Sequence, residues 1–177
     1  MSGWVTVYDK NKNLVEEDRV DGADTEETRL YALRLAYHKA LNDLNASQAT
    51  GDSSWQSAKA GLVELSEDLK ASMNKLNMTS ISDSFIHDCL QISFLVNKNL
   101  SRVLAKEESY GDALNIGLEA CDVMSELDCF DAGLIFRMAL LSLQNDCVWS
   151  SQQLLSLNRS KFSDLYERAV SGLEDSI

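Results

Sequence analysis

Six side chains of this sequence belong to the types that hold metals, exchange disulfides or act as nucleophiles. They are two histidines and four cysteines: His38, His87, Cys89, Cys121, Cys129 and Cys147. No two cysteines have the C-x-x-C spacing of a zinc or redox site, and the histidines lie far apart in the sequence. Each cysteine falls in or beside an apolar helical pattern, where a free thiol behaves as a small hydrophobic group. We therefore predict no metal centre and four buried, reduced thiols.

Other catalytic patterns are missing from the sequence as well. The eight glycines are scattered, so no glycine-rich loop is available to cradle a phosphate. Neither histidine has a serine or cysteine partner at a spacing that identifies a nucleophilic pair. Adjacent carboxylates such as Glu26-Glu27 and Glu107-Glu108 stand at helix starts or in loops, where they favour the helix dipole and solvation. We expect a protein that is not an enzyme, with no cofactor and no small-molecule substrate.

The charge balance restricts the partners of this chain. It has 16 basic and 28 acidic residues, a formal net charge of −12, which would repel nucleic acid and suits a basic protein partner. No apolar run is long enough to cross a membrane. The first residues, Met1-Ser2-Gly3-Trp4, carry no secretory signal. We therefore expect an intracellular protein without direct nucleic-acid or membrane binding.

The chain divides into an N-terminal arm and a helical domain. Residues 1–23 show no sustained period: 4–8 can form a short extended piece, and Asp9 to Asp24 is a charged connector. We predict that this arm is mobile or orders against a partner, with Trp4 and Tyr8 as candidate anchors because aromatic residues dominate binding hot spots. Residues 24–177 are the predicted helical domain.

Apolar residues recur at three- and four-residue steps through seven segments of that domain, and the chain contains no proline. The first helix has a capping-box-like start at Asp24-x-x-Glu27 and is expected to break at Asn45 to Gly51. The third is expected to start near Ser82 or Asp83, the fifth opens near Asp131, and the sixth is expected to be capped by Asn145 and Asp146. The fifth stripe comprises Ile135, Phe136, Ala139, Leu140 and Leu143. These seven helices with short connections predict an all-α row of antiparallel hairpins.

Two of the hairpins align with each other at an offset of 38 residues, with Leu100, Ser101, Leu104 and Ala113 over Met138, Ala139, Ser142 and Ser151. The segment from Asn99 to Leu104, with Tyr110, Ala113 and Ala120, resembles the tetratricopeptide repeat (TPR) family. Gly117 departs from that pattern, because an aromatic residue is usual there. The resemblance implies three TPR-like hairpins and a C-terminal capping helix in a right-handed superhelical array. A generic seven-helix bundle would show similar stripes.

A narrower likeness rests on three short blocks: Tyr37-His38-Lys39-Ala40-Leu41, Gln56 to Ala60, and Asn97-Lys98-Asn99-Leu100. They are similar to the N-terminal repeats of the Cabin family, the scaffold subunit of the HIRA-type histone-regulator complex. This resemblance implies a nuclear, non-enzymatic scaffold piece in the deposition of histones H3–H4. Its expected partners are other complex subunits, with histones H3–H4 a further possibility.

The TPR likeness also carries an alternative function. Some TPR adaptors grip the C-terminal carboxylate of chaperones or other acidic peptides with a clamp of Lys, Asn and Arg. By family alignment, Asn42, Asn99 and Arg137 match three clamp positions, whereas His38 and Gly133 stand where lysines are usual. The loss of two cations weakens charge-assisted bonding to a carboxylate. Partner binding at Asn42, Asn99 and Arg137 is therefore expected only in this alternative.

Overall fold

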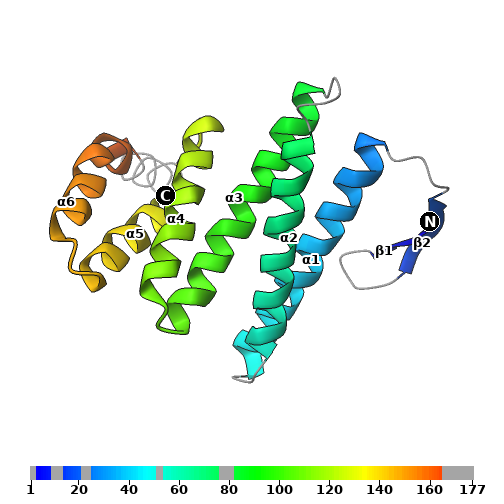
Figure 1. The fold of residues 1–177 in the computed structure, drawn as a ribbon, viewed down its shortest axis with the longest axis horizontal. Helices are drawn as coiled ribbons and strands as arrows, with labels where there is room; N and C mark the ends of the chain where they lie inside the picture. Colours follow the sequence, from blue (N-terminus) through cyan, green and yellow to red (C-terminus); the bar gives the residue numbers. More distant parts are fainter. Residues whose placement is uncertain (1–2, 9–13, 21–24, 51–53, 76–81, 165–177) are drawn as a thin grey trace, which may run out of the picture.

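The computed structural model describes residues 3–8, 14–20, 25–50, 54–75 and 82–164. Its helices follow one another in a row, with α1 and α6 at opposite ends (Figure 1). Residues 159–164 are helical too, so the described residues contain parts of seven helices, as the sequence predicts. The all-α class is confirmed for the domain that follows the arm. The six helices with complete bounds are α1 Glu26–Thr50, α2 Ser54–Lys75, α3 Asp83–Lys106, α4 Tyr110–Glu126, α5 Ala132–Gln144 and α6 Val148–Leu157.

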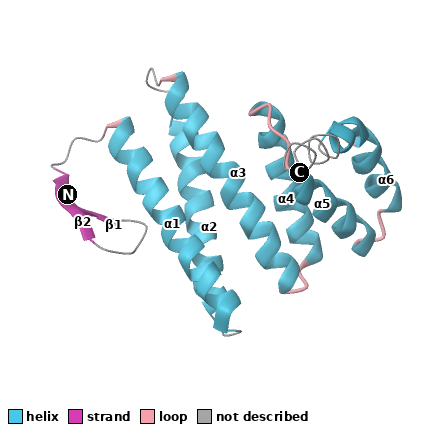
Figure 2. Cartoon of the chain, turned by 180° about the vertical axis from the view of Figure 1, so that it is seen from behind, coloured by secondary structure: helices cyan, strands magenta, loops and turns pink. Residues whose placement is uncertain are grey.

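A two-stranded antiparallel hairpin precedes the helices and lies beyond α1 at that end of the row (Figures 1 and 2). Strand β1, Gly3–Tyr8, matches the extended piece expected from the sequence. Strand β2, Leu14–Val20, does not, because this segment was predicted to be a polar connector. Pairing with β1 supplies its backbone hydrogen bonds, and an acidic sequence does not prevent this pairing. Trp4 pairs with Arg19 and Tyr8 with Leu14, but the side chains of both anchors lie outside the described part.

Side-chain caps define where three of the helices begin. Ser82 accepts a hydrogen bond from the Phe85 amide, and Asp131 accepts one from the Leu134 amide at 2.8 Å, which confirms the predicted starts of α3 and α5. The box at α1 lies one residue later than predicted. Thr25 and Thr28 each accept a hydrogen bond from the other's backbone amide, at 3.2 and 3.1 Å. Threonine hydroxyls thus take the place of the expected Asp–Glu pair.

The predicted break at Asn45 is wrong, because α1 continues to Thr50. The segment from 45 to 50 contains neither glycine nor proline and includes two alanines, so nothing in it forces the helix to end. The extra turn brings α1 to 25 residues, next to 22 residues in α2. The first hairpin is consequently the longest of the array.

Three helices end in the same type of turn, although none has glycine in it. Glu108, Asp128 and Asp146 adopt left-handed backbone conformations, with φ of 61°, 48° and 59°. In each turn the next amide returns to a carbonyl five residues earlier, as in Ser109 to Leu104 at 3.0 Å. This is the Schellman arrangement, which satisfies the last carbonyls of a helix.

These turns explain one error and support the repeat. Asn145 and Asp146 end α5 rather than cap α6, since Asn145 donates through its side chain to the Leu141 carbonyl. The left-handed residues Glu108 and Asp146 are 38 positions apart, the offset found in the sequence. All eight residues aligned at that offset are buried. The second and third hairpins therefore share both a turn and a packing pattern.

Small residues bring α3, α4 and α5 together where these helices cross. Buried Ser101 donates a hydrogen bond to the Ala113 carbonyl of α4 at 2.7 Å. A Cβ atom added to Gly117 would lie 2.1 Å from the sulfur of Met138 and 2.9 Å from the Ser101 hydroxyl. Met138 is fully buried and fills the space beside the glycine. This packing accounts for a glycine at the position where the TPR pattern has an aromatic side chain.

No helix in the described part of the chain is both long and apolar enough to cross a membrane.

Candidate interaction surfaces

Side chains of α1, α3 and α5 contact one another along one face of the row. Asn99 donates from its amide to the Tyr37 hydroxyl at 3.1 Å and to the Leu95 carbonyl at 2.9 Å. Arg137 donates to the Lys98 carbonyl at 3.2 Å. Two of the three predicted clamp residues thus lie on neighbouring helices and each has a contact within the chain. Their role in partner binding stays a prediction.

The remaining clamp positions are more exposed to solvent than Asn99 and Arg137. Asn42 and His38 are exposed on α1, one helical turn apart, and the His38 ring lies 5.9 Å from that of Tyr37. Gly133 is exposed in the first turn of α5. Among the described residues, no hydrogen bond or ion pair joins Asn42 to Asn99 or Arg137.

A small charged group lies between α3 and α5 on this same face. Lys98 forms an ion pair with Asp131, the residue that caps α5. Burial would raise the pKa of Asp131, but hydrogen bonds from Lys98 and the Leu134 amide outweigh it, so the pKa is lowered. Burial and the nearby Arg102 lower the pKa of Arg137. Arg137 therefore lies within electrostatic range of both the Arg102 cation and the Asp131 carboxylate.

The cysteines divide into two classes, which corrects the prediction of four buried thiols. Cys89 is buried and Cys121 is half-buried, and burial raises the pKa of each thiol to about 11. Cys129 and Cys147 are exposed, because each occupies the last position of a Schellman turn rather than a helical stripe. No group of three or more potential metal ligands occurs in the described residues.

The fifth helix is apolar on two faces. Ile135 and Ala139 are buried, as predicted, but Phe136, Leu140 and Leu143 are 51 %, 61 % and 45 % exposed. The three exposed residues are spaced i, i+4 and i+7 and share one face, which we call the α5 stripe. Other apolar side chains exposed on α6 are Val148, Trp149, Leu155 and Leu157.

An aromatic cluster marks one end of the α5 stripe. The Phe162 ring lies 4.7 Å from that of Phe136 and 5.3 Å from that of Phe130. The seventh helix was predicted to cover the open edge of the last hairpin, and this role stays a prediction. Residues 165–177, which include the rest of that helix, lie outside the described residues.

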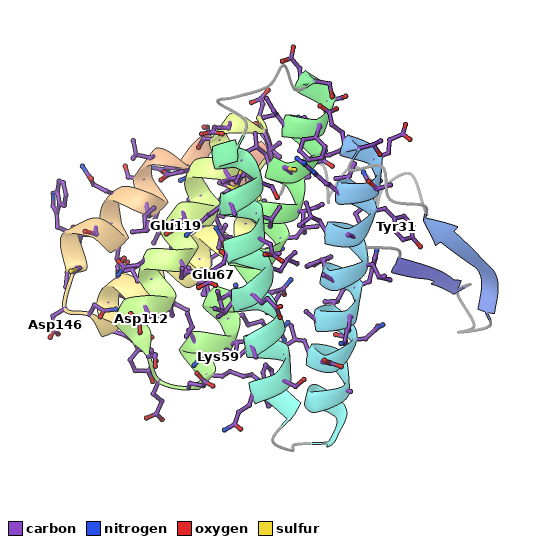
Figure 3. The ribbon with its side chains drawn as sticks, turned by 45° about the vertical axis from the view of Figure 1, so that its right-hand side comes forward. Tyr31, Lys59, Glu67, Asp112, Glu119 and Asp146 are labelled. Carbon is purple, nitrogen blue, oxygen red and sulfur yellow. The ribbon has the colours of Figure 1, made fainter. Side chains whose placement is uncertain are left out.

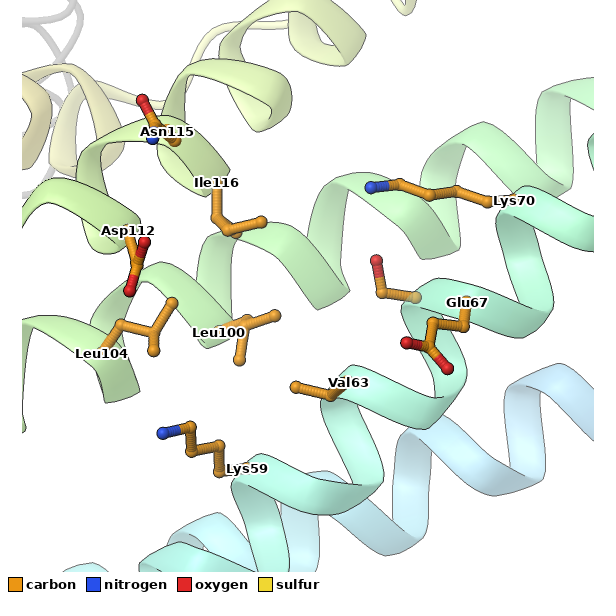
Figure 4. Close-up of a pocket in the computed structure, with 10 residues that line it drawn as sticks. Lys59, Val63, Glu67, Lys70, Leu100, Leu104, Asp112, Asn115 and Ile116 are labelled. Carbon is orange, nitrogen blue, oxygen red and sulfur yellow. The ribbon is translucent and has the colours of Figure 1, made fainter. Parts of the chain in front are cut away.

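A groove of about 410 Å³ lies between α2 and α4, with α3 beneath it (Figure 4). Its apolar part comes from all three helices, as Val63, Leu100, Leu104 and Ile116. Charged and amide side chains of α2 and α4 border it (Figures 3 and 4). These polar lining residues are Lys59, Ser66, Glu67, Lys70, Asp112 and Asn115.

Both lysines of this groove have acidic partners. Lys59 lies 2.5 Å from a Glu107 carboxylate oxygen at the end of α3, and Lys70 lies 3.1 Å from Glu119 of α4. These ion pairs connect α2 to α3 near one end of the groove and to α4 near the other. Within the described part of the chain, neither Glu67 nor Asp112 has an ion-pair partner. The uncompensated charge of the groove is therefore negative.

Buried polar side chains extend beneath the groove. Asn97 is 2 % exposed, and its side chain lies 3.5 Å from both the Ser66 hydroxyl and the Glu119 carboxylate. Because a buried amide is costly without a partner, these contacts fix the position of α2 over α3. The groove is thus bordered by a defined arrangement of side chains.

Sequence reasoning missed both the groove and the α5 stripe as surfaces. On α2, positions 59, 63, 67 and 70 recur at helical spacing beside the core stripe, which was a usable signal. It could not reveal the opposite wall, because that wall comes from α4. For α5, the usable signal was that its apolar residues are too many and too widely spread around the helix to be buried on a single face.

No known protein family matches this chain in sequence, and no curated protein matches it either.

Proposed function

We propose that this protein is a non-enzymatic scaffold that binds other proteins through the surface of its helical row. The observation that carries the proposal is the α5 stripe, in which Phe136, Leu140 and Leu143 place three large apolar side chains on one exposed helix face. Large contiguous apolar patches are uncommon on the surfaces of monomeric proteins, and they often mark sites where other proteins bind. Phe162 of the seventh helix packs against Phe136 at one end of this stripe.

The finer architecture that we propose is a TPR-like array. Three features support it: the 38-residue repeat, the small residues at the α3–α4 crossing, and the succession of contacts along the row. Helices of such arrays form extended recognition surfaces. Direct contacts join α1 to α3 and α3 to α5, so alternate helices share one face. The right-handed superhelical course and the capping role of the seventh helix belong to this proposal.

In its narrowest form, the proposal is a scaffold piece of a nuclear histone H3–H4 deposition complex of the HIRA type. The support is the likeness at Tyr37 to Leu41 and Asn97 to Leu100, together with a net charge of −12 that suits a basic partner. The partner surfaces would be the helical row and the N-terminal arm with Trp4 and Tyr8. Exposed charge attraction is screened over about 8 Å at physiological ionic strength, so such binding should weaken strongly with salt.

Affinity purification from nuclear extract tests this proposal, with mass spectrometry to identify the retained proteins. The wild-type chain is compared with Leu140→Lys, which places a charge on the α5 stripe at a side chain that is already 61 % exposed. We expect histone-regulator subunits or histones H3–H4 with the wild type and their loss with the variant. Recovery of the same proteins with both chains would refute the role of the stripe. Recovery of no protein partner would refute the scaffold function.

The acidic-peptide adaptor remains a second candidate because Asn99 and Arg137, two of the predicted clamp residues, lie on neighbouring helices along one face. A terminal carboxylate placed there would accept charge-assisted hydrogen bonds from Arg137. Titration with an acidic C-terminal peptide tests this function. Micromolar binding that Arg137→Ala abolishes would favour the adaptor over the histone-deposition scaffold, whereas binding that the variant leaves unchanged would exclude the predicted clamp.

A further inference from the structure

The groove between α2 and α4 differs from the α5 stripe in chemistry. Its floor is apolar, with Leu100 and Leu104 of α3 beneath and Val63 and Ile116 on the two walls. Its volume is about 410 Å³. Val63 is 37 % exposed, so part of this apolar surface is open to solvent.

The charges on the border of the groove indicate which kind of ligand it can bind. The two lysines on its border are already neutralised, by Glu107 and Glu119. Glu67 on the α2 wall and Asp112 on the α4 wall remain without an ion-pair partner among the described residues. An occupant with apolar side chains on one side and cations on both flanks would therefore satisfy the floor and both walls.

The dimensions favour a short helical segment. Positions 59 to 70 of α2 follow the groove, and at a rise of about 1.5 Å per residue they span about 16 Å. An amphipathic helix of about three turns has the same length and presents apolar residues at i, i+3 or i+4 and i+7. A helix with acidic flanks would meet Glu67 and Asp112 with like charge, so the groove selects against it.

We propose that this groove binds a short amphipathic helix of a partner protein, with its apolar side against Val63, Leu100 and Ile116 and its lysine or arginine residues beside Glu67 and Asp112. The inference rests on the proposed scaffold function and assigns it a second surface with a defined chemistry. It requires no rearrangement of α2, because the ion pairs with Glu107 and Glu119 lie at the ends of the groove.

Fluorescence anisotropy with a labelled synthetic peptide tests this inference. The probe is an amphipathic helix of about 14 residues with leucine on one side and lysine on the other, a length that covers the groove with one further turn. A peptide with glutamate in place of lysine is the control probe. We expect the cationic peptide to bind the full chain and the anionic peptide to bind at least about tenfold more weakly.

Matched variants separate the groove from the general negative charge of the protein. Glu67→Gln with Asp112→Asn should weaken binding about tenfold, because both partners of the peptide cations are removed. Asp68→Asn with Asp128→Asn removes the same formal charge from exposed sites outside the groove and should change binding less than about twofold. Val63→Arg should weaken binding further, since it places a cation on the apolar wall.

Equal losses in the two double variants would overturn the inference, because they would show attraction to overall charge alone. Absence of peptide binding to the wild type would also overturn it. A dimer of the wild-type chain that Val63→Arg dissociates in sedimentation would show instead that a second copy occupies the groove. These outcomes leave the scaffold proposal standing if nuclear proteins are still retained through the α5 stripe. Failure of that retention refutes the scaffold independently of the peptide result.

Discussion

The crossing at Gly117 gives the most direct test of how this array is packed. Replacing a helix-interior glycine with alanine normally stabilises a helix by about 0.5–1 kcal/mol, because alanine loses less backbone entropy on folding. At Gly117 the added methyl group would lie 2.1 Å from the sulfur and 2.2 Å from the terminal carbon of Met138. Both distances are far below van der Waals contact. Met138 must therefore move if Gly117→Ala is to fold.

The surroundings determine the cost of that movement. Met138 and Ser101, which would lie 2.9 Å from the new methyl group, are both fully buried, so neither side chain can turn into solvent. Overpacking of such a site costs about 1–3 kcal/mol. With the higher end of that range and the propensity gain subtracted, we expect Gly117→Ala to lower the free energy of unfolding by about 2 kcal/mol. This corresponds to a fall in Tm of about 4–8 °C for a chain of this size.

Gly61 provides the matched control because it also lies inside a helix. A Cβ atom at Gly61 would lie 3.4 Å from the Ala40 Cβ, an ordinary contact. We expect Gly61→Ala to raise the free energy of unfolding by about 0.5–1 kcal/mol. Urea unfolding followed by far-ultraviolet circular dichroism measures both variants on the same helical signal. The packing predicts that Gly117→Ala lowers the free energy of unfolding and that Gly61→Ala raises it.

A double-mutant cycle assigns the effect to Met138. Met138→Ala alone should cost about 2–5 kcal/mol, because it leaves a cavity in the core. In that background Gly117→Ala no longer meets a sulfur atom and should be neutral or stabilising, which gives a coupling energy of about 2–3 kcal/mol. Stabilisation by Gly117→Ala in the wild-type background, or a coupling energy below about 0.5 kcal/mol, would refute this account of the crossing.

Three further results are expected. Glu108→Gly should stabilise the protein by about 1 kcal/mol in urea unfolding, because glycine adopts φ near 61° without the steric cost of a side chain; an unchanged midpoint would contradict this. Asp131→Asn should cost about 0.5–1 kcal/mol near neutral pH through loss of the charge beside Lys98. The lowered pKa of Asp131 means that this contribution is complete above the ordinary carboxyl pKa of about 3.9 and disappears as the pH falls through the folded value, so Tm measured from pH 7 to pH 2 should converge for the two chains. With a thiol reagent under native conditions, Cys129 and Cys147 should react first and the other two cysteines only slowly, whereas four equal rates would contradict the described burial.

Much of the helical pattern could be predicted from local sequence because helix starts and core stripes are local signals. Ser82 and Asp131 cap their helices as expected, since each cap needs only its own amide three residues on. The repeat offset was also visible, because aligned positions such as Ser101 and Ala139 carry small residues in the same place. These features depend on neighbours within a few residues or on internal comparison.

The predictions failed where a feature depends on a distant part of the chain, or where a turn contains a residue type that is unusual for it. The turn residue Asp146 gave no glycine signal, so the end of α5 was hard to place. The second strand depends on pairing with β1, which its own acidic sequence does not indicate. The groove requires α2 and α4 to approach across α3, and no spacing within one helix specifies that distance. The second strand and the groove therefore depend on tertiary packing, which local sequence patterns do not specify.

The row of helices also has a consequence for cooperativity. Each helix contacts mainly its sequence neighbours, so local opening can proceed from an end without disrupting α3 and α4, which share the most extensive contact. The α6 end is the weakest, because that helix has ten residues and Ser151 is its one buried side chain. Amide hydrogen exchange should thus be fastest in α6 and slowest in α3 and α4. A protein that docks on the α5 stripe would slow exchange at this end, so binding of a partner would be recorded as protection of the least stable hairpin.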